Sequence, residues 1–159
     1  MTGVVRTRPA SSRIALGWRE YLALPALGVE CIRAKIDTGA RSSSLHVREQ
    51  DLFELDGRRT VRFVIEHGPR GQLRHAVETE VIAEREVTDS GGHRSRRLFI
   101  RTQLALSGGP AWPIEINLTH RRNMLFPMLL GRTALRRRCV IDPSRSFLLG
   151  RPDDPGVPA

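Results

Sequence analysis

The sequence predicts an all-β, single-domain protein that closes into a barrel and carries one short helix near its C-terminus. Three observations support this fold class. Apolar residues recur at every second position in several runs, which is the period of a half-buried strand. Glycine-rich turns separate these runs, and only residues 132–138 have helical character. Closely spaced strands joined by such turns are typical of a compact barrel or sandwich.

The chain has the length and composition of one folded unit. Its 159 residues are 40% hydrophobic, and domains commonly have about 100–150 residues around one core. We expect this unit to span 14–150. Residues 1–13 are predicted to be a flexible N-terminal segment. Residues 151–159 are predicted to be a flexible C-terminal tail, because their prolines cannot pair within a sheet.

The predicted elements follow one another along the chain. The first important strand is the apolar run 31–36, and alternation predicts further strands over 61–66, 77–84, 98–106 and 114–119. Turns between them fall at 56–57, 68–71, 89–92 and 107–110. Residues 132–138 are the predicted helix, because Thr133-Ala134-Leu135 can form one and the arginines that follow complement the negative end of its dipole.

The charged residues exclude one common kind of phosphate-binding site. The formal net charge is +9, and Lys35 is the only lysine. Lys35 is followed by Ile36, so the chain has no phosphate-binding loop of the kind that uses Lys before Ser or Thr. The positive charge favours acidic partners, although a solvated arginine-rich surface explains it equally well.

No cofactor or metal is predicted. Cys31 and Cys139 are far apart and lack the spacing of a zinc clip or a disulfide framework. The five histidines do not show the paired spacing of a zinc protease helix. No apolar run approaches the roughly 20 residues of a membrane helix, and residues 1–13 lack the apolar block of a secretion signal. We therefore expect a cytoplasmic protein that does not contact a membrane.

The candidate site is the tetrapeptide Asp37-Thr38-Gly39-Ala40, directly after the strand at 31–36. Much later, an apolar run ends in Gly131-Arg132 before the predicted helix. Hydrolysis of an amide without a metal needs one group to accept a proton from water and another to donate one. Two carboxyl groups held about 3 Å apart share a single proton and meet both needs. One chain supplies one such Asp, so this chemistry requires a homodimer. The alternative is that Asp37 is an ordinary turn residue.

The chain resembles a bacterial family of single-domain retropepsin-like aspartic endopeptidases, which have been described as ATP-dependent zinc proteases and are associated with RimK-type glutamate ligases. The segments that carry this resemblance are 17–21, 35–46, 89–93, 112–115 and 126–132. The resemblance implies a closed acid-protease barrel with Asp37 as the catalytic residue. Thr38, Gly39 and Ala40 would form the active-site loop, Gly131 and Arg132 would support it, and a second subunit would complete the dyad.

Two further features follow from the resemblance. The segment 87–97, with Ser90, Gly91, Gly92 and His93 at its tip, lies where related enzymes carry a flap over the substrate. His93 also fits a simple solvated turn. Retroviral relatives place acidic residues after the Asp loop, whereas this chain has Arg41 and Ser42, which leaves the partner of Arg132 open. An insertion at about 47–76 separates the loop from the flap.

Three functions are compatible with these patterns. The leading hypothesis is an aspartic peptidase that cleaves a peptide or protein, with acidic or glutamate-rich tails as the substrate class that the arginine excess and the RimK association suggest. A basic module that binds nucleic acid or an acidic protein is the alternative. Nucleic acid is the weaker partner, because aromatic residues are only 5% of the chain and no strand clusters them for base stacking. The third is an inactive retropepsin fold that serves as a scaffold.

Overall fold

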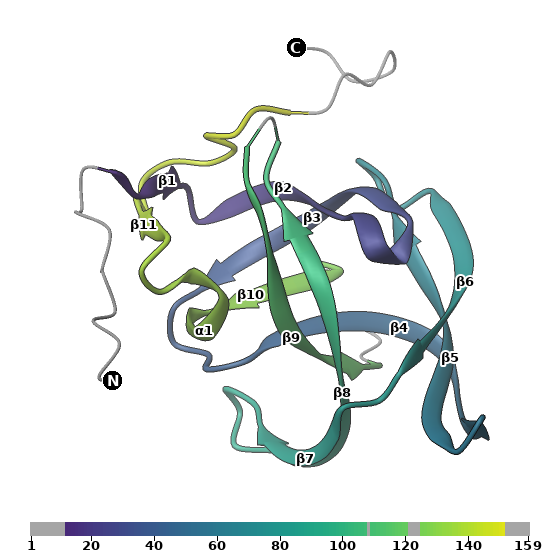
Figure 1. Cartoon of the computed structure of the whole chain (residues 1–159). Coiled ribbons are helices and arrows are strands. Elements are labelled where there is room, and N and C mark those ends of the chain that lie inside the picture. The colour runs from purple at the N-terminus through teal and green to yellow at the C-terminus, as the bar shows by residue number, and fades with distance from the viewer. Residues whose placement is uncertain (1–11, 108, 121–124, 152–159) are drawn as a thin grey trace, which may run out of the picture.

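The computed structural model describes residues 12–107, 109–120 and 125–151, and these residues fold almost entirely into strands (Figure 1). The all-β prediction is therefore confirmed. The two predicted flexible ends lie almost wholly outside the described residues. The strands are β1 Ile14–Leu16, β2 Arg19–Leu24, β3 Val29–Asp37, β4 Ser43–Leu55, β5 Arg58–His67, β6 Leu73–Glu80, β7 Ala83–Thr88, β8 Arg94–Ala105, β9 Ala111–Thr119, β10 Met128–Gly131 and β11 Cys139–Ile141.

Six strands form a ring in the order β10, β3, β2, β8, β9, β4, because β10 pairs with β3 on one side and with β4 on the other. The prediction of a closed barrel needs one correction. β2 and β8 are joined only by the pair Ala23 and Ala105, so the barrel is not strictly closed there. The register of β2 shifts between Leu22 and Leu24, and the chain then enters the 3-10 turn Pro25–Leu27, which ends the pairing early.

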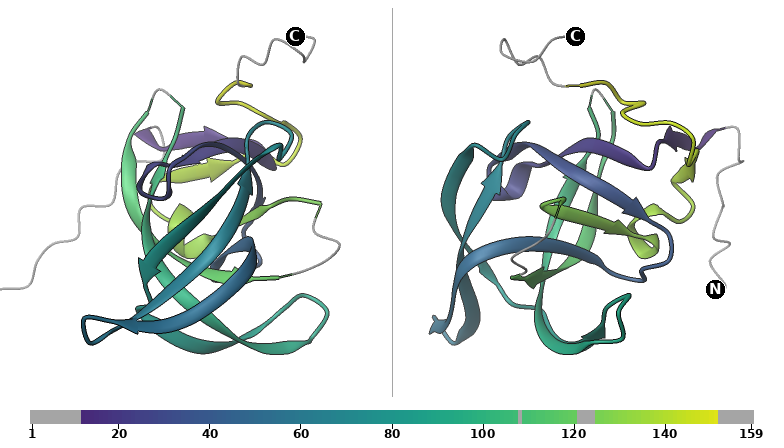
Figure 2. Two further views of the ribbon diagram at one scale, coloured as in Figure 1. Left: turned by 90° about the vertical axis from the view of Figure 1, so that its right-hand side faces the viewer. Right: turned by 180° about the vertical axis from the view of Figure 1, so that it is seen from behind.

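The predicted insertion at about 47–76 extends the sheet. β4 runs on past the barrel and pairs with β5, which pairs with β6, and in Figure 2 the blue hairpin of β4 and β5 projects from the barrel. Val61, Phe63 and Ile65 of β5 are fully buried, as their alternation predicted. The run predicted over 77–84 is divided, because β6 ends at Glu80 and β7 begins at Ala83.

Buried carboxyl and backbone groups hold the two ends of the described chain together. β1 pairs in parallel with β11, so that Ile14 lies beside Cys139. Glu20 is fully buried, and its carboxylate accepts hydrogen bonds from the N–H groups of Gly17 at 2.7 Å and of Leu148 and Leu149 at 3.0 Å. An early strand and the final segment are thereby joined through one side chain.

The helix is shorter than predicted. α1 covers Arg132–Leu135, whereas the prediction extended to 138. The backbone becomes extended at Arg136, and Arg137 has a φ of 68°, which is incompatible with a continuing helix. The short helix is fixed by Trp112, whose Nε1–H donates to the Ala134 carbonyl at 3.1 Å.

Candidate active site

Asp37 is the last residue of β3 and stands at the end of a buried strand. Ile32, Ala34 and Ile36 of β3 point into the core, while β3 is held between β2 and β10. Strand pairing on both sides leaves β3 little freedom. The Asp37 side chain is half-buried, and it leads into an exposed turn at Thr38 and Gly39.

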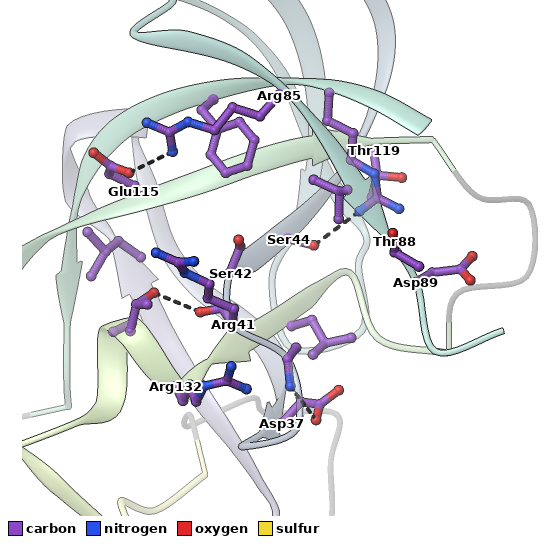
Figure 3. A pocket seen from close by; sticks show the side chains of 18 of the residues that line it. Asp37, Arg41, Ser42, Ser44, Arg85, Thr88, Asp89, Glu115, Thr119 and Arg132 are labelled. Atoms are coloured by element: carbon purple, nitrogen blue, oxygen red, sulfur yellow. Dashed lines mark hydrogen bonds and ion pairs between the residues drawn. The ribbon is translucent and has the colours of Figure 1, made fainter. Parts of the chain in front are cut away.

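The backbone of the loop orients the carboxylate. Asp37 Oδ1 accepts hydrogen bonds from the N–H of Gly39 at 3.0 Å and of Ala40 at 3.2 Å (Figure 3). A side chain at position 39 would place its Cβ 3.2 Å from the same oxygen, so glycine allows the N–H to approach. The two backbone donors therefore hold the Oδ1 oxygen of the carboxylate in place.

The second predicted motif lies against this loop. β10 runs parallel to β3 with Gly131 opposite Asp37. Arg132 donates from its backbone N–H to the Ala40 carbonyl at 2.9 Å and from Nη1 to the Gly39 carbonyl at 3.1 Å. The Arg132 guanidinium, whose partner the sequence leaves open, therefore contacts a backbone carbonyl of the Asp loop.

A third set of contacts ties α1 to the loop. Thr133 donates from its backbone N–H and its hydroxyl to the Arg41 carbonyl, at 3.2 and 2.8 Å. The turn that carries Asp37 is thus hydrogen-bonded to two consecutive residues, Arg132 and Thr133. Two short motifs that are far apart in the sequence are therefore hydrogen-bonded to each other.

Asp37 faces a cleft of about 1060 Å³. The Asp loop and α1 form one wall, and β7 with its turn forms the opposite wall (Figure 3). The predicted site residues that line it are Asp37, Gly39, Ala40, Ser90 and Arg132. Thr38, Gly131, Gly91, Gly92 and His93 are not in this lining; Gly131 supports the loop from behind.

The predicted flap is a β-hairpin. β7 pairs with β8 from Ala83 opposite Phe99 to Thr88 opposite Arg94. Asp89 closes the turn, because its Oδ1 accepts the N–H groups of Gly91 and His93 at 2.9 Å. Gly92 has a φ of 82°, which favours glycine. His93 lines a neighbouring cavity of about 350 Å³, which shares Asp89, Arg97 and Thr119 with the main cleft.

The cleft is rich in charge of both signs. Its charged lining residues are Arg41, Arg85, Arg97, Arg132 and Arg136 with Asp37, Glu86, Asp89 and Glu115. Glu115 is bridged by Arg85 at 3.3 Å and by Arg101 at 3.6 Å. No local pattern indicates Arg85, Arg97 or Glu115 as site residues, because each occupies an ordinary strand position that only the sheet order brings to the cleft.

His46 of β4 and His120 lie outside the lining of the main cleft. His46 is buried and stacks on His120 with ring centroids 5.4 Å apart. Burial, followed by the charges of His120 and Arg48, lowers the pKa of His46 below its usual value. His46 lines neither cavity. Across residues 12–107, 109–120 and 125–151, no cluster of three or more His, Cys, Asp or Glu side chains is arranged to hold a metal ion.

None of the helices within the described part of the chain has the length and apolar character needed to cross a membrane.

Comparisons with known proteins agree with this geometry. Residues 15–152 match the family described as RimB-like, retropepsin-like aspartic endopeptidase RimB. The chain is 37% identical over 148 residues to a protein of Shewanella halifaxensis named "Probable alpha-L-glutamate ligase", covering 91% of this chain and 32% of that protein. A protein of the same name from Parasynechococcus marenigrum is 39% identical over 141 residues, covering 87% and 30%.

The chain thus spans about a third of the length of these curated relatives. Among solved structures, the Legionella pneumophila protein Lpg0085, of unknown function, superposes with a TM-score of 0.72 at 27% identity, covering 87% of this chain and 99% of that one. The match to the family model extends over nearly all of the described residues and includes both the Asp loop and the Gly-Arg motif. The chain belongs to the RimB-like family of retropepsin-like aspartic endopeptidases.

Proposed function

We propose that this protein is an aspartic endopeptidase in which Asp37 is the catalytic residue. The observation that carries the proposal is the placement of the Asp37 carboxylate at the cleft, with Oδ1 held by two backbone N–H groups. A carboxylate oriented by its own loop can hold a water against a peptide carbonyl. The membership of the chain in the retropepsin-like aspartic endopeptidase family supports the same chemistry.

The second carboxyl comes from another copy of the chain. The other acidic residues lining the cleft are committed to local structure or lie on the hairpin: Glu115 bridges two arginines, and Asp89 closes the hairpin turn. Two Asp37 side chains related by a twofold axis would share one proton, so that one accepts a proton from water and the other donates to the carbonyl. The Asp37 turn is exposed at Thr38 and Gly39, where a symmetric partner can approach.

The proposed substrates are acidic peptides, including glutamate-rich protein tails. Arg41, Arg132 and Arg136 line the part of the cleft formed by the Asp loop and α1, and the chain has a formal net charge of +9. Arginine forks bind carboxylates through paired hydrogen bonds. The curated relatives carry the name of a glutamate ligase, which supports a role on glutamate-containing products.

Replacement of Asp37 tests the catalytic assignment. Asp37→Asn keeps the shape of the side chain and its acceptor oxygen but removes the acid, so cleavage of a glutamate-rich peptide should fall by at least about a thousandfold. Asp51→Asn, an exposed change on β4, is the matched control and should leave the rate unchanged. Full activity of Asp37→Asn would contradict the proposal.

A mixing experiment tests the shared dyad. If one active site uses Asp37 from two chains, an excess of Asp37→Asn protein should inhibit the wild type by forming inactive mixed dimers. Sedimentation velocity across protein concentration would show the dimer directly. A wild-type rate that is unaffected by excess variant, together with a monomer at every concentration, would refute the two-chain site.

Salt and peptide composition test the substrate class. Cleavage of a glutamate-rich peptide should weaken as salt rises from 0.1 M to 1 M, since the screening length falls from about 10 Å to about 3 Å. A glutamine-rich peptide of the same length serves as the control. Equal cleavage of both peptides at every salt concentration would remove the acidic preference while leaving the peptidase assignment in place.

A further inference from the structure

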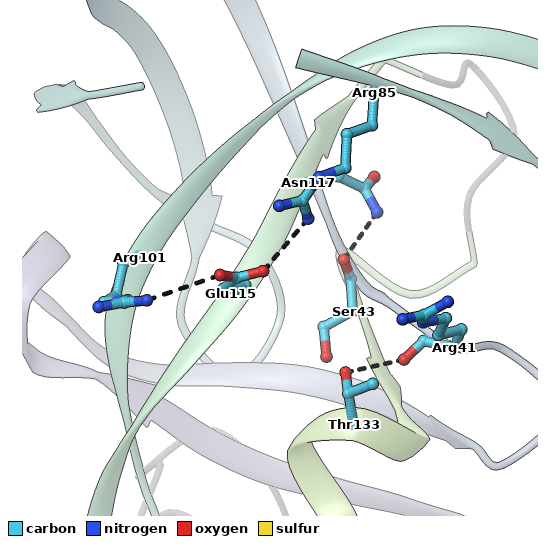
Figure 4. A network of polar contacts seen from close by, with 7 residues as sticks. All are labelled: Arg41, Ser43, Arg85, Arg101, Glu115, Asn117 and Thr133. Atoms are coloured by element: carbon cyan, nitrogen blue, oxygen red, sulfur yellow. Dashed lines mark hydrogen bonds and ion pairs between the residues drawn. The ribbon is translucent and has the colours of Figure 1, made fainter. Parts of the chain in front are cut away.

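A buried side chain connects the start of β4, which follows the Asp loop, with β8 at the base of the hairpin. Asn117 on β9 is fully buried, and its Nδ2 donates to the Ser43 carbonyl at 2.8 Å (Figure 4). Its Oδ1 accepts from Arg97 Nη1 at 2.9 Å and from the Ser44 hydroxyl at 3.0 Å. One amide thus contacts Ser43 and Ser44 of β4 and Arg97 of β8.

The orientation of this amide is determined by its partners. A carbonyl oxygen can only accept, so the group facing Ser43 must be the NH₂. A guanidinium can only donate, so the group facing Arg97 must be the oxygen. A flipped amide would oppose donor to donor and acceptor to acceptor, and the pair of contacts therefore fixes Asn117 in one state.

On the catalytic side, the connection reaches the residue opposite Asp37. Ser43 is fully buried, and its hydroxyl oxygen accepts the N–H of Gly131 at 3.0 Å. Gly131 lies opposite Asp37 in the pairing of β10 with β3. A displacement of Ser43 would move the strand end that supports the Asp loop.

On the other side, the connection enters the hairpin. Arg97 is only 9% exposed, lies on β8 opposite Arg85 of β7, and donates from Nε to the Ser95 hydroxyl at 3.0 Å. Arg97 also lies in the lining that the two cavities share. A buried guanidinium is costly to leave without acceptors, so a movement of the hairpin base should carry its hydrogen-bonded neighbours with it.

We propose that Arg97 and Asn117 are positioning residues that couple the β7–β8 hairpin to the Asp37 loop through Ser43 and Gly131. Substrate that closes the hairpin would thereby tighten the loop that holds the catalytic carboxylate. The kinetic side of this inference rests on the proposed peptidase function, whereas the structural coupling can be measured without any activity.

Arg97→Lys is the main test variant. Lysine keeps the positive charge and loses the fork that spans Ser95 and Asn117. Hydrogen–deuterium exchange should accelerate by about tenfold at the hairpin, residues 86–95, and at the loop, residues 38–44, as expected when a buried hydrogen bond is lost. Residues 61–66 of β5 serve as an internal reference and should exchange at the wild-type rate.

Arg101→Lys is the matched control. It makes the same change on the same strand at an exposed residue whose partner is Glu115, and it should leave both regions unchanged. Faster exchange confined to the hairpin in Arg97→Lys, or a uniform increase that includes 61–66, would overturn the coupling.

Asn117→Asp removes one hydrogen bond of the connection, the one from Asn117 Nδ2 to the Ser43 carbonyl. The aspartate can still accept from Arg97, but it has no donor for the Ser43 carbonyl. Exchange should then rise at 38–44 and stay near wild type at 86–95, while the reverse pattern would overturn the proposal. If Asn117→Asp does not fold, the Arg97→Lys comparison still decides the question.

Kinetics distinguish this proposal from the peptidase assignment. With an active enzyme, Arg97→Lys should lower kcat by about tenfold relative to Arg101→Lys, since the loop geometry is disturbed after substrate binds. An equal kcat in the two variants would overturn the functional coupling. A wild type without peptidase activity would refute the proposed function, and the exchange pattern would still test the network.

Discussion

Gly131 lies opposite Asp37 in the parallel pairing of β10 and β3, and its N–H is held by the Ser43 hydroxyl. A Cβ at position 131 would lie 2.5 Å from the Ser42 backbone and 3.0 Å from the Ala40 carbonyl oxygen. The absence of a side chain at Gly131 is thus what lets the Asp loop pack against β10. This contact is the point where the two sequence motifs meet.

Gly131→Ala should destabilise the fold by about 1–3 kcal/mol, because backbone atoms must move to admit the methyl group. The rate of peptide cleavage should fall by more than the loss of folded protein accounts for, because the displaced atoms belong to the Asp37 loop. Thermal unfolding and peptide cleavage measure the two effects. Gly109→Ala is the control, because its Cβ would meet nothing closer than 3.5 Å. Equal melting temperatures for the two variants would contradict this account.

Glu20→Gln should destabilise the protein by about 2–4 kcal/mol. The glutamine side chain offers one oxygen and one NH₂ to three backbone N–H donors, so at least one donor faces another in a fully buried site. Chemical denaturation would measure the loss. Glu54→Gln, an exposed change on β4, should be neutral within about 0.5 kcal/mol.

Stability should fall with pH below about 6.5, in part through His67. His75 Nε2 faces the Leu27 carbonyl at 2.7 Å and must carry hydrogen, so in a neutral His75 ring Nδ1 accepts from His67 Nε2 at 2.8 Å. Protonation of His67 would place a hydrogen on its Nδ1, which is buried and has no hydrogen-bond partner among the described residues. Burial, and then the charge of His75, lower the pKa of His67.

The lowered pKa of His67 determines how stability changes with pH. The unfolded chain binds a proton near pH 6.5 and the folded chain only at lower pH, so this contribution is complete above about pH 6.5 and is lost as pH falls toward the folded pKa. His67→Gln should flatten the decline of melting temperature between pH 7.5 and 5.5, while the exposed change His93→Gln should not. An unchanged slope in His67→Gln would show that this ring does not contribute.

The Cys139 thiol should resist labelling in the native protein. Burial raises its pKa to about 11, so about one molecule in a thousand carries the reactive thiolate at pH 8. Burial also raises the pKa of the half-buried Cys31 thiol, which should react slowly. A thiol reagent should modify Cys139 only after unfolding and Cys31 slowly in the native protein, and Cys31→Ser identifies which thiol reacts. Rapid native labelling of Cys139 would contradict its burial.

Local sequence patterns predicted the strands because side chains alternate between core and solvent in a sheet. Val61, Phe63 and Ile65 are an example: their spacing indicated a strand, and all three are fully buried. The same pattern could not reveal that β2 and β8 meet through one pair, since sheet order and register depend on contacts between distant segments. The helix was overextended because propensity does not detect the backbone change at Arg136.

The candidate site was predictable only in part. The Asp-Thr-Gly-Ala loop and the Gly-Arg pair are contiguous motifs, and the structure places them against each other. Their catalytic and supporting roles stay predictions. Arg85, Arg97 and Glu115 line the same cleft, but they are single polar residues on different strands. Glu20 lies within segment 17–21, which carries the family resemblance. Its neighbours in sequence do not indicate that its carboxylate binds the N–H groups of Leu148 and Leu149.

The pairing of β1 with β11 has a consequence for how this unit can be built into larger proteins. Ile14 and Cys139 lie side by side in this pairing, and Figure 1 shows β1 and β11 together at the left edge of the molecule. After β11 the chain continues to Leu148 and Leu149, whose N–H groups bind Glu20 of β2, so the last described segment returns to the strand that follows β1. An extension at either end of the described chain can therefore be added without breaking a strand pair of the barrel.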